Sequence, residues 1–352
     1  GLGHFRDLGA IAEPIDSYLW KGKLYLGLWE EKTLEELPAS FALFKQELIL
    51  ADNDGLAPNQ PIELSQKLEL DQLSAAEWIR QMPASIAKRA DEASRKIYER
   101  FQTDPSVDRV DPMRDVVELM DQYCRSALGT TPDRLSALAF ANFYISELDT
   151  RYSSPMGTGV LSRTMASTLF DRPHLVKLQL NSTVTRLKDT GELVELTFTQ
   201  AGKLRQSQAR HAIFAAQLKF APKIIDGLAK TDPQKAEAIE ALDYSHYLVH
   251  VVHLKGHPYR ATYDTWTRAS DYRLTDFTDV ILGRWLDPAI RGYEGLRDFK
   301  KSPDDDHGIM AIYHPFHSVH DMNQRGRMQR QTPSTEQHAK RVAKMAVSRM
   351  IE

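Results

Sequence analysis

Residues 152–225 constrain the fold more than any other part of the chain. A turn rich in glycine and proline opens this segment, and apolar residues at helical spacing follow it. Short apolar runs and a Thr190-Gly191 turn then indicate strands and a hairpin. The elements that we expect are a helix that begins near Val160, a strand over residues 174–180, a hairpin of residues 183–188 and 193–199, and a strand over residues 212–216.

The order of these pieces resembles the second FAD-domain segment of the flavin-dependent amine oxidase superfamily. In that family a phrase like GGxxxL opens the helix, and residues 157–161 read GTGVL here. A valine of the family places its backbone amide and carbonyl against the adenine, and the matching residue is Val184. The family's AxP phrase reads Ala215-Ala216-Gln217, without the proline. The resemblance therefore implies FAD as the cofactor and Val184, Ala215 and Ala216 as residues that bind it.

Other phrases resemble the same family in the same order. Residues 5–10 (FRDLGA) resemble its xxDLGG loop beside the flavin ring, which implies that Gly9 and Ala10 bind the cofactor. Residues 70–78 and 123–136 resemble helices of the substrate domain. Residues 242–254 resemble the strand that returns from the FAD domain to the substrate domain. The likeness covers most of the chain, and its specificity comes from the order of the phrases.

The fold class implied by the resemblance is α/β with an α+β second domain. One domain would be part of an FAD/NAD(P)-binding Rossmann-like fold of the amine oxidase type, and the other a helix-rich substrate domain. Residues 1–20 and 152–228 would belong to the FAD-binding domain, and residues 21–151 and 229–352 to the substrate domain. We expect the two domains to interleave, with residues 177–180 close to residues 5–10.

Several patterns predict local structure directly. Residues 18–29 indicate two strands around Lys21-Gly22-Lys23. Ser74 and Glu77 have the spacing of a capping box at a helix start, and Gly129 is a plausible helix C-cap. The helices that we expect between residues 33 and 148 cover residues 34–51, 74–80, 84–101, 115–128 and 132–147. Later in the chain we expect a helix over residues 232–242 and strands over residues 247–254 and 308–315.

Composition narrows the class of protein and of partner. The 352 residues are 42% hydrophobic and 26% charged, as in soluble globular proteins. A net charge of −3 argues against a nucleic-acid partner. No apolar run approaches the roughly 18 residues that a membrane-spanning helix needs. Because the chain starts at Gly1 rather than Met, we interpret it as a piece of a longer protein, and we expect this piece to bind FAD weakly or not at all. The compartment, cytoplasmic or periplasmic, stays open.

The candidate metal and nucleophile residues have simpler explanations. Seven histidines lie at spacings that suggest a metal site: His246, His250, His253, His257, His314, His317 and His320. Along a strand, side chains alternate between the two faces, so the first four cannot converge on one ion without a second element. We therefore expect no metal. Cys124 lies in an apolar helical pattern, which favours a packed thiol over a nucleophile.

An aromatic group is the candidate substrate site. Oxidation of an amine by a flavin needs a water-poor face above the ring, with groups that orient the substrate. Trp266, Tyr263 and Tyr313 lie in the region that would form such a wall, and ordinary packing is the alternative role for each. Many amine oxidases carry a lysine that holds a water near the flavin, and Val249 occupies that position here. No catalytic side chain is assigned.

The function that follows is an FAD-dependent oxidoreductase of the amine oxidase type. It would take a hydride from a carbon next to the nitrogen of a small-molecule amine. The alternatives are a related flavoenzyme that acts on an isoprenoid, a porphyrin or a sugar, and a non-catalytic protein of the same fold. The electron acceptor and the oligomeric state stay open.

Overall fold

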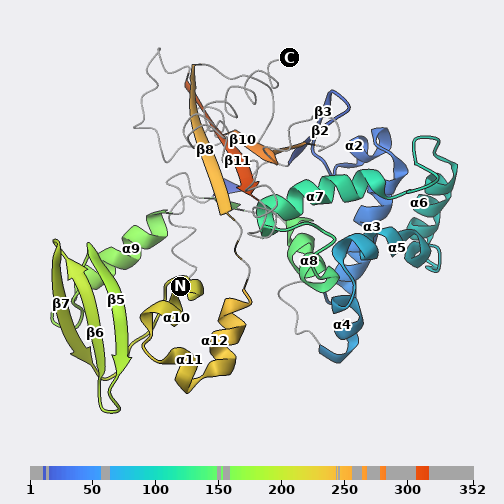
Figure 1. Cartoon of the computed structure of the whole chain (residues 1–352). Coiled ribbons are helices and arrows are strands. Elements are labelled where there is room, and N and C mark those ends of the chain that lie inside the picture. Colours follow the sequence, from blue (N-terminus) through green and yellow to red (C-terminus); the bar gives the residue numbers. More distant parts are fainter. Residues whose placement is uncertain are drawn as a thin grey trace, which may run out of the picture. The chain divides into compact units, whose positions relative to one another are not determined.

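The computed structural model describes residues 11–12, 16–56, 64–148, 152–153, 159–242, 244, 246–255, 264–267, 278–282 and 307–316. The chain divides into two compact units (Figure 1). Unit 1 comprises residues 1–155 and 245–352, and unit 2 comprises residues 156–244. The domain assignment made from the sequence stays a prediction, since residues 1–10 lie outside the described part of the chain.

The first part of unit 1 is helical. Its helices are α2 (Glu31–Glu36), α3 (Ala39–Asn53), α4 (Leu64–Asp71), α5 (Ala75–Ile86), α6 (Glu92–Thr103), α7 (Arg114–Leu128) and α8 (Ala137–Tyr144), with a 3₁₀ turn at Ile145–Leu148. The single helix expected over residues 34–51 is wrong, because Pro38 divides it into α2 and α3. The Asp104 carboxylate accepts a hydrogen bond from the Ala39 N–H at 2.8 Å and so caps α3.

Two further helix boundaries differ from the prediction, while two caps agree with it. The helix expected over residues 84–101 is two helices, since α5 continues to Ile86 and α6 begins after the N-cap Asp91. The helix expected from residue 132 begins only at Ala137, where the Ser136 side chain caps it. The capping box at Ser74 is confirmed. Gly129 ends α7 with a φ of 69°, a conformation that favours glycine.

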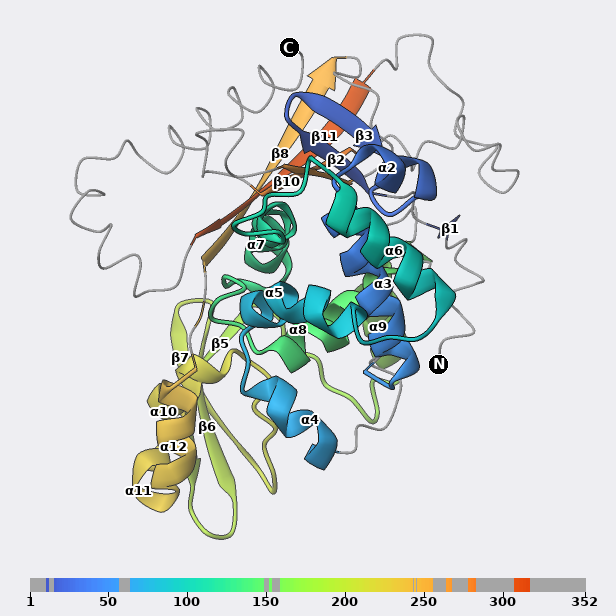
Figure 2. The ribbon, with the colours of Figure 1, turned by 90° about the vertical axis from the view of Figure 1, so that its right-hand side faces the viewer.

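A mixed sheet completes unit 1 (Figure 2). Its strands are β2 (Ser17–Trp20), β3 (Lys23–Leu26), β8 (His246–Lys255), β9 (Asp264–Thr267), β10 (Asp279–Leu282) and β11 (His307–Phe316), in the order β3-β2-β9-β10-β11-β8. Only β2 and β9 run parallel. Lys21 and Gly22, with φ values of 49° and 76°, form the tight turn expected between β2 and β3. A separate two-stranded ladder joins β1 (Ile11–Ala12) to β4 (Tyr152–Ser153).

The core of unit 1 lies between this sheet and the helices. Tyr18 of β2 is fully buried and contacts Phe41 of α3, with the ring centroids 5.7 Å apart. Trp266 of β9 and Tyr123 of α7 belong to the same buried cluster. Aromatic side chains from distant parts of the chain therefore hold the helices against one end of the sheet.

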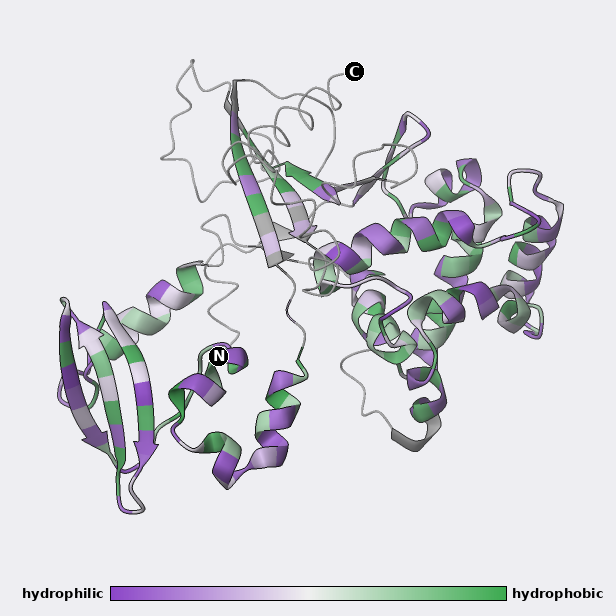
Figure 3. Ribbon diagram, in the orientation of Figure 1, coloured by the Kyte–Doolittle hydropathy of each residue, from purple (hydrophilic) through white to green (hydrophobic). Residues whose placement is uncertain are grey.

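Unit 2 is built around a three-stranded meander. Its elements are α9 (Gly159–Phe170), β5 (Ser182–Asp189), β6 (Val194–Gln200), β7 (Lys203–Ala209), a 3₁₀ turn (Leu218–Phe220), α10 (Ala221–Ile224), α11 (Leu228–Thr231) and α12 (Pro233–Glu240). The helix from Val160 and the hairpin are confirmed. The strands expected over residues 174–180 and 212–216 are wrong, because these runs form no ladder in the described part of the chain. β7 was missed because its residues are largely hydrophilic (Figure 3).

Candidate functional site

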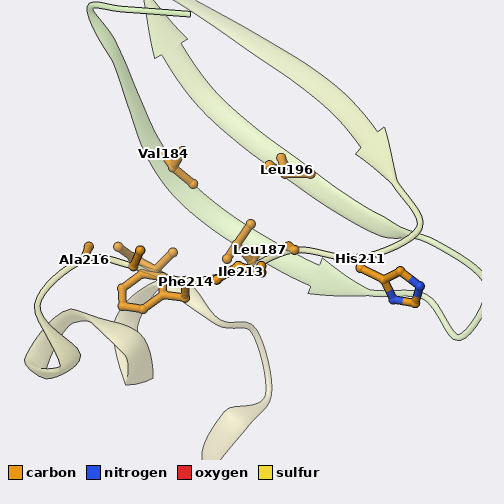
Figure 4. Close-up of a pocket in the computed structure, with 10 residues that line it drawn as sticks. Val184, Leu187, Leu196, His211, Ile213, Phe214 and Ala216 are labelled. Carbon is orange, nitrogen blue, oxygen red and sulfur yellow. The ribbon is translucent and has the colours of Figure 1, made fainter. Parts of the chain in front are cut away.

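A pocket of about 390 Å³ opens in unit 2 between the meander and residues 211–216 (Figure 4). The residues that line it are Val184, Leu187, Leu196, His211, Ala212, Ile213, Phe214, Ala215, Ala216 and Ile224. Apart from the His211 imidazole, these side chains are apolar. The wall of the pocket is therefore almost entirely apolar.

Three of the residues assigned to the cofactor from the sequence share this pocket. Val184 comes from β5, and Ala215 and Ala216 come from the segment that follows β7. The other two, Gly9 and Ala10, lie outside the described residues. Sequence reasoning missed His211, although it stands directly before the apolar run 212–216 that was noted.

The position of β5 at the edge of the meander determines which of its backbone groups β6 does not pair. β5 is an edge strand, and its register against β6 shifts between Val184 and Arg186. On the outer edge, the Leu187 C=O accepts a hydrogen bond from the Asp226 N–H at 2.8 Å. An ion pair between Arg186 and Asp226 holds the same segment against β5. The outer edge of β5 is therefore paired near Leu187.

The second candidate site is one face of the sheet in unit 1. Asp279 pairs with Trp266 on one side and with Tyr313 on the other, and Tyr313 pairs with Val249. Directly opposed residues of antiparallel strands point to the same face. These four side chains, with Tyr247 two residues before Val249, therefore share a face that we call the aromatic wall. Tyr263 lies outside the described residues.

The wall is buried at one end and open at the other. Trp266 is buried against Tyr123 of α7, with the ring centroids 5.2 Å apart, and its Nε1 donates to Asp16 Oδ2 at 3.3 Å. Tyr313 contacts the Tyr247 ring in a T-shaped arrangement at 5.6 Å. On β8 and β11, Tyr247, Val249, Val251 and Ile309 are exposed. A ligand can therefore reach the Tyr247 end of the wall, whereas Trp266 is part of the core.

A buried carboxyl group lies within the wall. Asp279 is 2% exposed, and burial raises its pKa to about 7. Hydrogen bonds from Ser126 and Thr278 pull the pKa down, and the nearby Asp16 raises it. Burial and the charge of Asp279 raise the pKa of Tyr247. Sequence reasoning missed Asp279 and Tyr247, and the available signal was a carboxylate at the start of the apolar run DVIL.

The remaining candidates are the histidines and Cys124. In the described part of the chain, no group of three or more His, Cys, Asp or Glu residues could hold a metal ion. His250 is buried and His253 is exposed, as expected for opposite faces of β8, and His257, His317 and His320 lie outside the described residues. Cys124 is fully buried, and burial raises the pKa of its thiol, which confirms a packed side chain.

Comparison with known proteins identifies the family. The model of the family described as "Flavin containing amine oxidoreductase" matches residues 12–279. The chain belongs to this family. No curated protein sequence matches the chain. Two similar solved structures are a protein from Pyrococcus furiosus, with 13% identity and a TM-score of 0.50, and an oxidoreductase from Methanosarcina mazei, with 10% identity and a TM-score of 0.55; each match covers 93% of this chain and 67% of the other.

Family membership confirms the general assignments made from the sequence. The protein is an FAD-dependent oxidoreductase that acts on a small molecule. The mixed sheet with its helices agrees with an α/β FAD-binding protein of this family. The two solved structures, at their low identity, support the fold alone. No helix among the described residues is long and apolar enough to cross a membrane.

Proposed function

We propose that the protein oxidises a carbon next to an amine nitrogen, with the substrate held at the open end of the aromatic wall. The observation that carries this proposal is the carboxyl group of Asp279 behind Tyr247 and Tyr313. A buried acid beside one exposed and one half-buried aromatic ring favours a ligand that carries N–H donors and positive charge. Bound FAD supplies the acceptor for the hydride.

The side chains of the wall orient the substrate and exclude water. The rings of Tyr247 and Tyr313 meet at 5.6 Å, and the exposed Val249 and Val251 extend the apolar surface along β8. Such a surface displaces water from the carbon that loses the hydride. Val249 cannot hold a water molecule as a lysine would. Substrate position in this proposal therefore depends on the tyrosine hydroxyls.

The pocket of unit 2 is the proposed adenine site. The register shift at Thr185 places Val184 and Leu187 on the same side of the ladder, and Leu187 presents its C=O to the outer edge. The backbone N–H and C=O of Val184 then face that edge as well, beside the pocket. A purine edge needs one donor and one acceptor in this arrangement, while Ala215 and Ala216 leave room for the ring.

A second candidate substrate class is an apolar one, such as an isoprenoid. Val249, Val251 and Ile309 form an exposed apolar strip on β8 and β11. Exposed apolar strips of this kind bind hydrocarbon ligands or cofactor rings. For an isoprenoid substrate, the carboxyl group of Asp279 would have no polar group to recognise. We rank this class second for that reason.

The test is reduction of the bound flavin without oxygen. The full-length protein is loaded with FAD, and the flavin absorbance is followed after addition of benzylamine or of farnesol. We expect bleaching by the amine and none by the alcohol. Tyr247→Phe should slow bleaching by about tenfold through the loss of one hydrogen bond, whereas Tyr98→Phe on α6 should not. Bleaching by farnesol alone would replace the amine with an apolar substrate.

A further inference from the structure

Helix α7 contacts the aromatic wall at its buried end and at its open end. At the buried end, the centroid of the Tyr123 ring lies 5.2 Å from that of Trp266. At the open end, Ser126 Oγ lies 2.8 Å from the Tyr247 hydroxyl oxygen. Tyr123 and Ser126 are three positions apart, so both project from the same face of the helix. This face of α7 therefore holds the wall at two points.

The way in which α7 ends determines where the Ser126 hydroxyl lies. Ser126 belongs to the last turn of the helix, which Gly129 closes with a φ of 69°. The N–H groups of Gly129 and Thr130 both donate to the Cys124 C=O, the second at 3.3 Å. A left-handed C-cap of this kind holds the last turn in one conformation. A local sequence signal, the glycine after Leu128, therefore positions a side chain at the wall.

The Tyr247 ring is held at both of its ends. Its backbone belongs to the β8–β11 ladder, where Tyr247 pairs with Pro315. Its hydroxyl lies against Ser126, and its ring meets the Tyr313 ring at 5.6 Å. Rotation about χ2 leaves the hydroxyl in place, so χ1 is the torsion that would swing the whole ring. Because Tyr247 is 39% exposed, packing leaves part of the ring open, and the contact with Ser126 opposes this swing.

The contact depends on a hydroxyl at position 126 and not on its direction. The hydroxyl groups of Ser126 and Tyr247 can each donate and each accept, so either proton can form the hydrogen bond. An alanine at position 126 would remove the bond and leave the ring with its contact to Tyr313. One ordinary hydrogen bond corresponds to a factor of about five in the population of the swung ring.

We propose that Ser126 is a positioning residue that fixes the Tyr247 ring and so limits the size of the amine at the open end of the wall. This rests on the proposed function, because it takes the substrate to lie against this ring. A fixed ring excludes a bulky substituent on the nitrogen, whereas a ring that swings away admits it. The specificity therefore comes from a steric barrier that α7 holds in place.

The first experiment measures the motion of the Tyr247 ring without ligand or flavin. Tyrosine labelled with ¹³C in the ring is incorporated into the full chain, and Tyr247→Phe assigns the resonances. Relaxation of the ring carbons gives an order parameter, which reports rotamer changes of exposed side chains on the picosecond to nanosecond timescale. We expect Ser126→Ala to lower the order parameter of Tyr247. Ser126→Thr keeps the hydroxyl and should restore it.

A matched serine separates this effect from the general loss of a hydroxyl. Ser106, in the loop before α7, is exposed, and its Oγ donates to Asp104 Oδ1 at 2.6 Å. Ser106→Ala therefore also loses one hydrogen bond, and it should leave the Tyr247 order parameter unchanged. Circular dichroism verifies the fold of each variant. A Tyr247 ring that is as rigid in Ser126→Ala as in the unaltered protein would overturn the proposal.

The second experiment compares two amines that differ in bulk. Benzylamine and dibenzylamine are titrated into the full chain, and the shift of the Tyr313 resonance reports the binding of each. We expect the unaltered protein to bind benzylamine more tightly, because the fixed ring excludes the second benzyl group. Ser126→Ala should lower this preference by about fivefold, the factor of one ordinary hydrogen bond. Ser126→Thr and Ser106→Ala should keep the preference.

The same preference in Ser126→Ala as in the unaltered protein, or binding of neither amine, would overturn the role of Ser126 in specificity. Neither experiment depends on flavin reduction. A ring that loosens in Ser126→Ala, in a protein whose flavin no amine bleaches, would keep the positioning role and remove amine oxidation. Bleaching by benzylamine together with a ring that stays rigid would do the reverse.

Discussion

At the scale of single residues, the burial of the Asp279 carboxyl group has a cost in stability. Burial raises its pKa from 3.8 to about 7, so the folded protein holds a proton that the unfolded chain has already lost. The free energy of unfolding should therefore fall as the pH rises from about 4 to about 7. Above that window the loss amounts to at most about 4 kcal/mol.

We expect Asp279→Asn to remove this pH dependence. The free energy of unfolding in urea, measured at about pH 5 and at about pH 8, should differ less in the variant than in the unaltered protein. Asp133→Asn is the control, since the Asp133 side chain is 68% exposed. If Asp279→Asn loses as much stability between the two pH values as the unaltered protein, the pH dependence comes from other groups.

Val184 carries the prediction for the cofactor. Val184→Ala should cost about 1 kcal/mol of packing at most and leave FAD bound, because the recognition that we propose uses backbone groups. Val184→Pro deletes the N–H donor at the same position and should abolish FAD retention. Flavin absorbance after gel filtration of full-length protein measures both. Retention of FAD in the proline variant, with folding verified by circular dichroism, would remove Val184 from the site.

Single residues were predictable from the sequence where their role is local. Cys124 lies in an apolar helical pattern, and that pattern determines its burial without knowledge of the fold. Asp279 and Tyr247 lie 32 positions apart, and Ser126 precedes both by more than 120 positions. The register of β8, β10 and β11 brings Tyr247 and Asp279 to one face of the sheet, and the packing of α7 brings Ser126 to Tyr247. Their connection was therefore outside the reach of sequence patterns.

At the scale of elements, the start of α5 shows how strongly a local signal can determine structure. Ser74 Oγ accepts from the Glu77 N–H at 3.2 Å, and the Glu77 carboxylate accepts from the Ser74 N–H at 2.8 Å. We expect Ser74→Ala to lower the free energy of unfolding by about 1 kcal/mol. Glu77→Gln, which can still accept, should cost much less. Equal losses in urea unfolding of the two variants would contradict the reciprocal cap.

The strands of unit 2 show where local signals fail. Residues 174–180 and 212–216 are apolar enough for strands, but a strand also needs a partner for its backbone groups, and the described residues supply none. β7 has a partner and a polar sequence, so hydrophobic alternation could not reveal it. The turn at Ala201-Gly202, with φ values of 49° and 72°, was the signal that could have revealed it.

At the scale of the whole molecule, the two units differ in how much apolar surface they bury. Unit 1 holds a large continuous core in which Tyr18, Phe41, Phe44 and Phe140 are fully buried. In the described part of unit 2, the buried apolar residues are Val160, Leu187, Phe198, Ala221, Ala236 and Ile239. Its large apolar side chains are mostly exposed, and Ile213, which lines the pocket, is 94% exposed. Unit 2 therefore has less of the hydrophobic stabilisation that keeps a fold closed.

We expect hydrogen exchange to separate the two units and to reveal the cofactor site. Without FAD, amides of α3 and α7 should exchange much more slowly than those of β5, β6 and β7, because local opening is easier where few apolar contacts are lost. A ligand that binds the folded state suppresses opening at its site. Added FAD should therefore slow exchange in peptides that cover Val184 and residues 211–216, while peptides from α6 stay unchanged as an internal control. Protection by FAD that is confined to unit 1 would remove the adenine site from the pocket of unit 2. Protection at the pocket in Val184→Ala, together with its loss in Val184→Pro, would link this pattern to the backbone of β5 rather than to any side chain.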